Sequence, residues 1–300
     1  MYDIIVIGAG PAGLTAAIYA RRASKTVLVL EAMTYGGQII NTPDIENYPA
    51  APHISGLDFA NRLYEQATGL GAEVVFERVT EIKDGTEKTV VTAENTYTAK
   101  AVIIATGSQN RKLGIEGERE LVGRGVSYCA TCDGAFFRNK KVAVMGGGNT
   151  ALEDALYLAD LAETVYLIHR RGEFRGDEAT VNALKERQNI KFMLNSTVTK
   201  LIADKRLTAI EVTDKNTGAV TKLDVNGLFV AIGRTPENQP FEDLIKLDEA
   251  GYIAAGEDCI TNVPGIFAAG DNRTKSIRQL VTAAADGAAA ATAAVQYISR

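Results

Sequence analysis

The sequence has few cysteines, few histidines and no block of like charge. Of its 300 residues, three are cysteine and two are histidine, and the formal net charge is -5. Three cysteines are too few for the disulfide-built scaffold of a small secreted protein. A weak negative charge gives no electrostatic reason to bind nucleic acid or an anionic membrane. We therefore expect a globular protein with neither of these partners.

The chain also lacks the segments that would direct it to or across a membrane. Its N-terminus enters an apolar strand without a basic region or a cleavage site, so we expect no secretory signal and a cytoplasmic protein. The Ala-rich stretch 281–298 is long enough for a membrane span, but Asp286, Gly287 and Gln296 interrupt it. We expect it to form a helix buried against the protein body instead.

A strand–turn–helix–strand pattern opens the chain and recurs near its middle. The first copy has its strands and helix at residues 4–7, 14–23 and 27–30. The second copy has them at 142–145, 152–161 and 165–168. Much later, each copy continues into an apolar strand that ends in a glycine, at Gly107 and Gly233. The chain is therefore one βαβ plan built twice.

The second copy is predicted to be inserted into the first. After Gly233 the sequence turns polar, and a strand ending at Asp271 and a final helix follow without a counterpart in the first copy. We expect an α/β fold with two Rossmann-like nucleotide-binding domains. Residues 1–113 and 244–300 would form the first domain and residues 114–243 the inserted one. The polar crossings near 109–117 and 236–247 suit interdomain hinges.

Each copy carries a Gly-rich turn between its first strand and its helix, at residues 8–13 and 146–151. Glycines at such a turn allow a tight bend and a close approach of backbone to a pyrophosphate, which the helix N-terminus then holds. The motif alone is weak evidence. Here each turn follows a strand, opens a helix and leads to a second strand, which makes the nucleotide-binding interpretation strong.

The two copies differ in charge after their second strands. Glu31 lies eighteen residues after Gly13, where a carboxylate accepts hydrogen bonds from ribose hydroxyls. In the same register of the second copy stands His169, followed by Arg170, Arg171 and Arg175. Guanidinium groups suit a 2′-phosphate, so the second copy should prefer NADPH to NADH, and FAD fits the first. The alternatives are a surface carboxylate and a solvated basic helix start.

Cys129 and Cys132 form a Cys-x-x-Cys pair directly before Asp133. A zinc site would need four ligands, and only Cys259, His53 and His169 remain to complete one. A structural disulfide is disfavoured in the cytoplasm. The redox interpretation is therefore favoured, with Cys129 and Cys132 at a helix start that lowers the thiolate pKa. Asp133 could exchange protons with a sulfur, or could be a turn residue; Cys259 is expected to be a buried apolar residue.

These motifs together resemble those of the bacterial-type, low-molecular-weight thioredoxin reductases, over essentially the whole chain. The motifs that carry the resemblance are the two Gly-rich loops, Gly36-Gly37-Gln38, Ala105-Thr106-Gly107, Cys129 to Asp133, the His169 and arginine cluster, Gly270-Asp271 and Arg278-Gln279. Two positions depart from the family pattern, at Asn149-Thr150 and at Gly176, where alanine is common. The resemblance implies FAD in the first domain, NADPH in the inserted domain, and a homodimer that reduces thioredoxin.

The resemblance also implies roles for single residues. Cys132 would face the flavin, Cys129 would attack the thioredoxin disulfide, and Asp133 would be the acid/base. The implied FAD-binding residues are Gly8, Gly10, Pro11, Ala12, Glu31, Gly36, Gly37, Gln38, Asn47, Ala105, Thr106, Gly107, Gly270, Asp271, Arg278, Gln279 and Leu280. The implied NADPH-binding residues are Gly146, Gly148, Asn149, Thr150, Glu153, His169, Arg170, Arg171, Arg175, Ile232 and Gly233. Arg124, Ala135 and Phe136 could dock the partner; the alternatives are a solvated charge and a core aromatic residue.

The dithiol and the NADPH loop fall in the same inserted domain, and the resemblance implies that they use one flavin face in alternation. We therefore expect the inserted domain to rotate between half-reactions. The competing functions are a related flavoenzyme with another disulfide or peroxide partner, a dithiol oxidase, and a redox-sensing module that binds both cofactors without turnover. Larger disulfide reductases with their own C-terminal interface domain are excluded by the chain's length.

Overall fold

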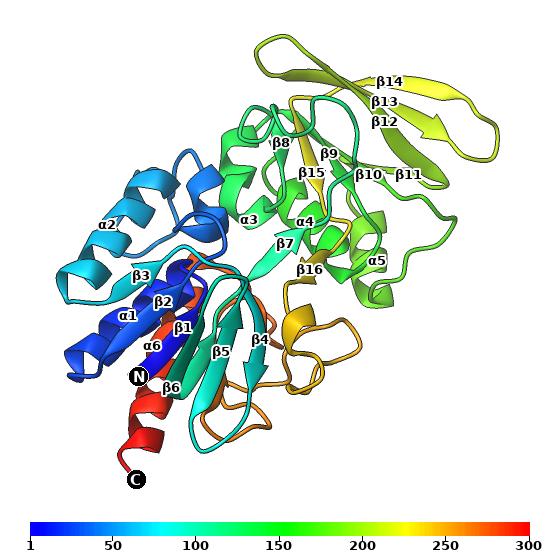
Figure 1. The fold of residues 1–300 in the computed structure, drawn as a ribbon. Helices are drawn as coiled ribbons and strands as arrows, with labels where there is room; N and C mark the ends of the chain where they lie inside the picture. Colours follow the sequence, from blue (N-terminus) through cyan, green and yellow to red (C-terminus); the bar gives the residue numbers. More distant parts are fainter. The chain divides into compact units, whose positions relative to one another are not determined.

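The computed structural model describes all 300 residues and divides into two compact units (Figure 1). Unit one comprises Met1–Gln109 and Thr235–Arg300, and unit two comprises Asn110–Arg234. The boundaries lie four and nine residues before the predicted positions 113 and 243. Residues just after 234 belong to unit one because Phe241 is buried in its core and the Asn238 amide donates to the carbonyl of Gly251 at 2.9 Å.

A seven-stranded sheet forms the middle of unit one, in the order β3-β2-β1-β6-β5-β4, with β17 also paired to β6. Its parallel strands are β1 (Tyr2–Ile7), β2 (Val27–Leu30), β3 (Glu73–Val75), β6 (Thr96–Ile104) and β17 (Ile266–Ala268). Two antiparallel strands, β4 (Val79–Lys83) and β5 (Lys88–Thr92), extend one side. β2 and the second half of β6 are apolar throughout because both faces of these strands are buried.

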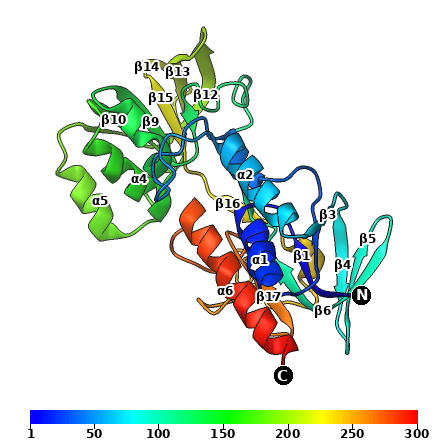
Figure 2. The same cartoon turned by 90° about the vertical axis from the view of Figure 1, so that its left-hand side faces the viewer.

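The helices of unit one are α1 (Pro11–Arg22), α2 (Gly56–Gly69) and α6 (Leu280–Ile298), with short turns η1 (Gly37–Asn41) and η3 (Gln239–Phe241). α6 lies along α1 in both views (Figures 1 and 2). Gly287 makes this close approach possible, since a Cβ there would collide with the Ala12 carbonyl. The prediction of a helix buried against the protein body is confirmed. No helix combines the length and the hydrophobicity needed to cross a membrane.

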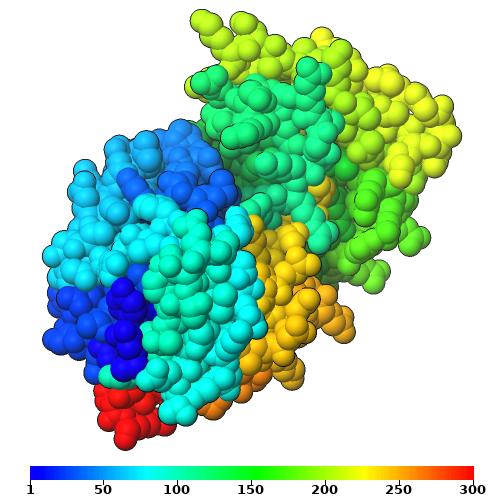
Figure 3. Space-filling model, viewed as in Figure 1, coloured from blue at the N-terminus to red at the C-terminus, as the bar shows by residue number.

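In the space-filling view, the β4–β5 region of unit one, in cyan, covers much of the face turned to the viewer, and the end of α6, in red, reaches the surface (Figure 3). Beneath this surface the core has two parts. One apolar cluster fills the space between the sheet and the α1–α6 pair, and the other lies on the opposite face of the sheet. The sheet is therefore covered on both faces, as a parallel sheet requires.

Unit two repeats the plan with a five-stranded parallel sheet in the order β11-β10-β9-β15-β8. Its strands are β8 (Val126–Ser127), β9 (Lys141–Met145), β10 (Thr164–Ile168), β11 (Ile190–Met193) and β15 (Gly227–Val230). Its helices are α3 (Ala130–Asp133), α4 (Asn149–Ala159) and α5 (Glu178–Lys185), with the turn η2 (Gly134–Phe137). A separate antiparallel sheet comprises β12 (Ser196–Ala203), β13 (Leu207–Asp214) and β14 (Val220–Asp224).

The internal duplication is confirmed by the strand orders. In unit one the third, second and first strands of the βαβ plan are followed by the late strand β6. In unit two the same order leads to the late strand β15, beyond which β8 is added. The two connections between the units pair with each other as the short strands β7 (Ser108–Asn110) and β16 (Arg234–Pro236). Both crossings therefore pass through one point of the fold, although they are far apart in sequence.

Candidate functional site

The two Gly-rich loops have the same geometry. At the first glycine of each loop, Gly8 or Gly146, a Cβ would collide with the carbonyl of the residue after the late strand, Ala105 or Ala231. These two glycines are therefore needed for the close packing of each loop against its own sheet. The loops begin at the carboxyl ends of β1 and β9, where an open parallel sheet places its ligands.

The middle glycines have a different role. Gly10 and Gly148 are the N-cap residues of α1 and α4, and neither helix has an acidic residue in its first turn. A Cβ on Gly148 would meet no atom within 4 Å, and one on Gly10 would meet only the Cα of Gly37, at 4.0 Å. Open space thus lies in front of two helix N-termini with free N–H groups. These are cradles of the kind that a pyrophosphate occupies.

Glu31 follows β2 and holds the first loop in place. Its carboxylate accepts hydrogen bonds from the backbone N–H groups of Ala9 at 2.8 Å and Met33 at 2.9 Å. The side chain is half-buried, and a carboxylate has about four lone-pair sites in total. It can therefore accept further hydrogen bonds from a ligand while it ties the loop to the strand.

His169, in the matching position of unit two, is placed differently. Its imidazole is 6% exposed and stacks on Phe174, with ring centroids 5.5 Å apart. Burial lowers the pKa of His169, and the charges of Arg170 and Arg171 lower it further. The imidazole is therefore neutral near pH 7. Its Nε2 is buried without a hydrogen-bond partner, beneath Gly147.

The arginine cluster lies beside the second glycine loop. The side chains of Arg170, Arg171 and Arg175 are exposed and form no ion pair. The backbone N–H of Arg175 donates to the carbonyl of Gly147 at 2.7 Å, which ties the cluster to the loop. Three unneutralised guanidinium groups beside an open helix N-terminus fit a phosphorylated ribose.

The departure from the family pattern at Gly176 has a steric explanation. A Cβ on Gly176 would collide with the side chain of Leu152 and would lie 2.8 Å from Oδ1 of Asn149, the first residue of α4. That Asn149 oxygen accepts a hydrogen bond from the Asp177 N–H at 2.8 Å. Gly176 and Asn149 therefore fit each other, and together they fix the segment after the arginine cluster against α4.

The other predicted cofactor residues mostly lie at helix starts and strand ends on the loop side of each sheet. In unit one these are Pro11 and Ala12 in α1, Ala105, Thr106 and Gly107 after β6, Gly270 and Asp271 after β17, and Leu280 at the start of α6. In unit two they are Thr150 and Glu153 in α4, and Ile232 and Gly233 after β15. Parallel strands end at one edge of a sheet, so each set gathers at one edge.

The predicted segment at Gly36 and Gly37 also joins the first loop. Both glycines have left-handed backbones, with φ of 99° and 62°, and the Gly36 N–H donates to the Ala9 carbonyl at 2.8 Å. Gln38 follows in η1. Asn47 and Gln279, which are far apart in sequence, are joined by an amide hydrogen bond of 3.1 Å.

The side chain of Arg278 braces the chain instead of pointing to open space. Its guanidinium lies 4.2 Å from the ring centre of Tyr252 and donates to the carbonyls of Lys275 at 3.1 Å and Arg273 at 3.3 Å. Its expected contact with FAD stays a prediction, and its observed role is to fix the loop that follows Asp271.

Sequence reasoning missed a buried charge cluster behind this loop. The carboxylate of Asp286, in α6, accepts hydrogen bonds from Arg273 at 2.7 Å, from Lys275 at 2.8 Å and from the Gly270 N–H at 2.9 Å. All three charged side chains are almost fully buried. Asp286 thus fixes both ends of the loop that carries Asp271. The only sequence signal was an acidic residue inside an Ala-rich helix.

A second set of buried polar residues also went unpredicted. The Asn272 amide donates to the Ile104 carbonyl at 3.0 Å and to the Thr106 hydroxyl at 3.2 Å, and the Asn238 amide donates to the Asn272 carbonyl at 2.8 Å. These bonds connect the end of β6 with the segments before η3 and after β17. They hold the predicted cofactor residue Thr106 in place.

Cys129 and Cys132 are joined by a disulfide bond, with their Cα atoms 5.3 Å apart. Cys129 is the N-cap of α3, a helix of one turn that η2 continues. Both cysteines are half-buried. The predicted sulfur pair at a helix start is therefore present in its oxidised form.

Asp133 lies at the end of the same turn. Burial raises the pKa of its carboxyl above the ordinary value, while a hydrogen bond from Ser127 opposes the rise. The bond joins Ser127 Oγ to Asp133 Oδ2 at 2.6 Å. A carboxyl next to a disulfide, with a raised pKa, is better suited than an ordinary aspartate to exchange protons with sulfur.

The segment before the disulfide is anchored by a carboxylate that sequence reasoning also missed. Glu118 is buried and accepts hydrogen bonds from the hydroxyl of Tyr128 at 2.8 Å and from the Leu113 N–H at 2.9 Å. Burial and this carboxylate raise the pKa of Tyr128 well above its usual range. Among the suggested docking residues, Arg124 and Ala135 are exposed, and Phe136 is 38% exposed.

The model of the pyridine nucleotide-disulphide oxidoreductase family matches residues 2–287. The chain belongs to this family. A thioredoxin reductase of Listeria innocua is 44% identical over 300 residues, covering 99% of this chain and 94% of the relative. The resemblance predicted from the motifs is therefore confirmed. FAD and NADPH are the cofactors of this oxidoreductase, and the two cradles described above fit their pyrophosphates.

Solved structures of relatives give the same identification. The thioredoxin reductase of Streptococcus pyogenes MGAS5005 is 40% identical, with a TM-score of 0.96, and covers 100% of this oxidoreductase and 98% of its own chain. That of Lactococcus lactis, in a structure titled an FR conformation, is 41% identical over 100% and 99% of the two chains, but its TM-score is 0.68. The predicted fold of two Rossmann-like nucleotide-binding domains is confirmed.

Proposed function

We propose that this oxidoreductase is a thioredoxin-disulfide reductase that passes electrons from NADPH through FAD to the Cys129–Cys132 disulfide. The observation that carries the proposal is this disulfide, with Asp133 beside it, in the same unit as a dinucleotide loop flanked by free arginines. The relatives named thioredoxin reductase support the choice of thioredoxin as the protein substrate.

The two nucleotide loops would take different cofactors. FAD would lie on the loop of unit one, where Gly10 faces open space and Glu31 supplies acceptors for ribose hydroxyls. NADPH would lie on the loop of unit two, where Gly148 faces open space and the arginines would hold the 2′-phosphate. His169 would support this site from below, because its neutral ring packs under Gly147.

The chemistry at the dithiol needs an electron pair and a proton donor. When bound, FAD would supply the electron pair, which it receives as hydride from NADPH. Cys132 would face that donor, and Cys129 would leave as a thiolate when the S–S bond breaks. The Asp133 carboxyl, with its raised pKa, would give the thiolate a proton. Cys129 would then attack the partner disulfide, and Asp133 would take the proton back.

The inserted unit would rotate between the two half-reactions. Two solved relatives support this, because they match this chain at nearly equal identity, 40% and 41%, but with TM-scores of 0.96 and 0.68. A drop in score without a drop in identity is the result expected when two rigid bodies are arranged differently. The crossings at β7 and β16 would be the hinges.

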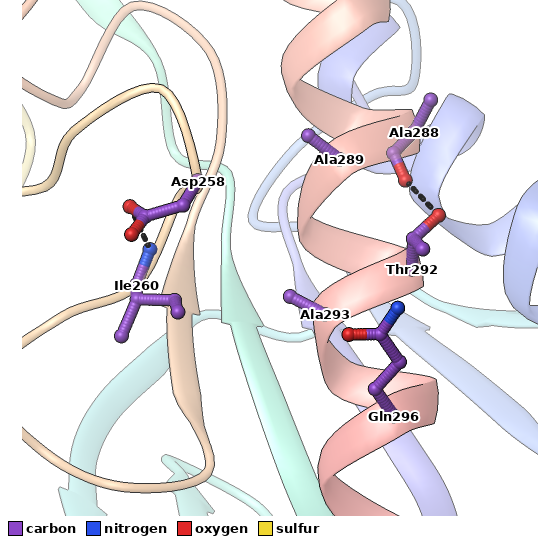
Figure 4. Close-up of a pocket in the computed structure, with 7 residues that line it drawn as sticks. All are labelled: Asp258, Ile260, Ala288, Ala289, Thr292, Ala293 and Gln296. Carbon is purple, nitrogen blue, oxygen red and sulfur yellow. Dashed lines mark hydrogen bonds between the residues drawn. The ribbon is translucent and has the colours of Figure 1, made fainter.

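We further propose a homodimer in the cytoplasm, where a cycling dithiol is kept reduced. The exposed face of α6 supports the dimer. A row of small side chains along α6 lines a shallow pocket, with Ile260, which is 49% exposed, on the other side of it (Figure 4). The row consists of Ala288, Ala289, Thr292 and Ala293. Sedimentation equilibrium of the wild type and of an Ala289→Glu variant tests this, and a monomeric wild type would contradict it.

An anaerobic titration of the purified protein with NADPH, and in parallel with NADH, tests the proposed reaction. We expect uptake of two electrons beyond those held by the flavin, preference for NADPH, and reduction of thioredoxin by the loaded enzyme. A Cys129→Ser variant should take up only the flavin's electrons. If the wild type behaves like this variant, the disulfide is disconnected from the flavin and the proposal is wrong.

A further inference from the structure

Ser127 contacts both ends of the turn that carries the disulfide, at Cys129 and at Asp133. It is the last residue of β8, is 4% exposed, and pairs in register with Phe229 of the neighbouring strand β15. Its hydroxyl is therefore carried by the sheet of unit two and not by a loop. From this position it reaches both the backbone of Cys129 and the carboxylate of Asp133.

The direction of each hydrogen bond follows from the single proton of the hydroxyl. The Cys129 N–H donates to Ser127 Oγ at 3.1 Å, which uses the oxygen as an acceptor. The hydroxyl proton then has two acceptors within reach, the Asp133 carboxylate at 2.6 Å and the Cys129 carbonyl at 3.3 Å. A hydrogen bond to an ionised acceptor is the shorter and stronger kind, so the proton goes to Asp133.

The carboxyl group is held a second time through its own backbone. The Asp133 N–H donates to the Cys129 carbonyl at 3.1 Å, which closes the turn around Cys132. With the backbone fixed by this bond, the contact with Ser127 fixes the rotation of the side chain and occupies Oδ2. The second oxygen, Oδ1, is then the one that can carry a proton without breaking the contact.

We propose that Ser127 is a positioning residue, which holds Oδ2 of Asp133 so that Oδ1 exchanges the proton with the dithiol. This inference rests on the proposed reductase function. In the reduction step, the electron pair supplied from NADPH breaks the S–S bond and leaves both sulfurs reduced. The proton on Oδ1 moves to the Cys129 thiolate, and Cys132 keeps the second sulfur as a thiolate. Asp133 is left as a carboxylate that accepts the hydrogen bond from Ser127. In the oxidation step the proton returns to Oδ1.

The test compares Ser127→Ala, which removes the hydroxyl, with Ser127→Thr, which keeps it. A matched control is Ser196→Ala, since Ser196 is an equally buried serine of unit two whose hydroxyl donates to the Leu194 carbonyl at 2.8 Å. The first measurement is the titration of Asp133 by NMR with ¹³C-labelled aspartate, in protein reduced by dithiothreitol, with Asp133→Asn to assign the signal. This measurement needs no turnover.

We expect the Asp133 pKa to rise in Ser127→Ala, because the carboxylate loses its hydrogen bond, and to stay unchanged in Ser127→Thr and in Ser196→Ala. In stopped-flow reduction by NADPH, the disulfide phase of Ser127→Ala should slow roughly tenfold and its pH profile should shift the same way, while flavin reduction is unchanged. If Ser127→Ala does not fold, Ser127→Gly removes the same hydroxyl and gives the same expectation.

An unchanged Asp133 titration in the variant without the hydroxyl overturns the inference, and so does a Ser127→Thr variant that behaves like Ser127→Ala. Failure of the proposed function itself gives a different result. In that case the wild type takes up no electrons beyond those of the flavin, while the NMR titration still reports whether Ser127 controls Asp133.

Discussion

Arg273 and Asp286 form a buried ion pair, with Nη2 and Oδ1 2.7 Å apart, behind the loop that follows β17. Lys275 contacts the same carboxylate at 2.8 Å. Buried charges are costly unless every one is paired and hydrogen-bonded, and here one carboxylate serves two cations and a backbone N–H. The cluster therefore makes the position of Asp271, a predicted flavin contact, depend on a residue in the last helix.

Replacing Asp286 by asparagine should destabilise unit one strongly. Lys275 would be left as a buried charge without a carboxylate, and Arg273 would keep only the exposed Glu257, at 3.4 Å. Loss of a buried partner of this kind costs about 3–5 kcal/mol. Urea unfolding followed by circular dichroism measures the loss. Asp160→Asn is the matched control, because the Asp160–Arg187 pair is exposed and should cost below about 1 kcal/mol. Equal effects in both variants would contradict this account.

The same carboxylate gives a pH dependence with a definite sign. Burial acts to raise the pKa of Asp286, but the hydrogen bonds from Arg273 and Lys275 lower it overall. Because the folded pKa lies below the unfolded value of about 3.9, this contribution to stability is present above that pH and is lost as the pH falls through the folded pKa. We expect wild-type stability to fall more steeply in acid than that of Asp286→Asn, as measured by unfolding at pH 2 to 6.

Gly148→Ala should separate ligand binding from folding. Its Cβ would enter open space, and the φ of -98° suits any residue, so stability should stay unchanged or rise by about 0.4–1 kcal/mol. The methyl group would fill the phosphate cradle, so we expect NADPH affinity to fall at least about tenfold by isothermal titration calorimetry. Gly146→Ala is the contrasting variant, because its Cβ would collide with the Ala231 carbonyl and lower stability.

Loss of the arginine pair should change the preference between nicotinamide cofactors. In Arg170→Gln/Arg171→Gln the 2′-phosphate loses its charge-assisted hydrogen bonds, which are worth about 1.5–3 kcal/mol each. The KM for NADPH should rise at least about tenfold while the KM for NADH hardly changes. Arg187→Gln, which removes an exposed arginine on the same unit, is the control. A parallel rise for both cofactors would refute the 2′-phosphate role.

Cys259 should not react with thiol reagents in the native protein. It is fully buried, and burial raises the pKa of its thiol to about 11. A colorimetric thiol assay should therefore find no reactive thiol in the oxidised native protein, two after reduction of Cys129–Cys132, and three after denaturation of the reduced protein. A reactive thiol in the native oxidised state would show that Cys259 is accessible.

Local sequence patterns predicted much of this fold correctly. The predicted strand 27–30 matches β2, and the predicted strands 142–145 and 165–168 match β9 and β10 to within one residue. These segments were predictable because a strand buried on both faces has to be apolar along its length. The glycine loops were predictable for a similar reason, since only glycine fits where the backbone meets a neighbouring carbonyl.

The supporting contacts were not predictable in this way. Ser127, Glu118 and Asn272 are ordinary polar residues in the sequence, and their importance comes from burial and from hydrogen bonds that no local pattern predicts. The second domain boundary lies before the predicted position 243 for a related reason. Phe241 packs into the core of unit one, although it follows a polar stretch that resembles a linker. A sequence pattern shows which residues are neighbours along the chain, but it does not show which side chains meet once the chain has folded.

The sequence by itself determined the duplicated βαβ plan, the contrast between Glu31 and the arginine cluster, and the presence of a dithiol beside a carboxyl. Each of these depends on residue type and short-range spacing, which the chain displays directly. Only the tertiary structure decided that His169 lies neutral beneath its loop, that Asp286 pairs two buried cations, and that Ser127 holds Asp133. These depend on desolvation and on buried hydrogen bonds, which exist only after the chain has folded.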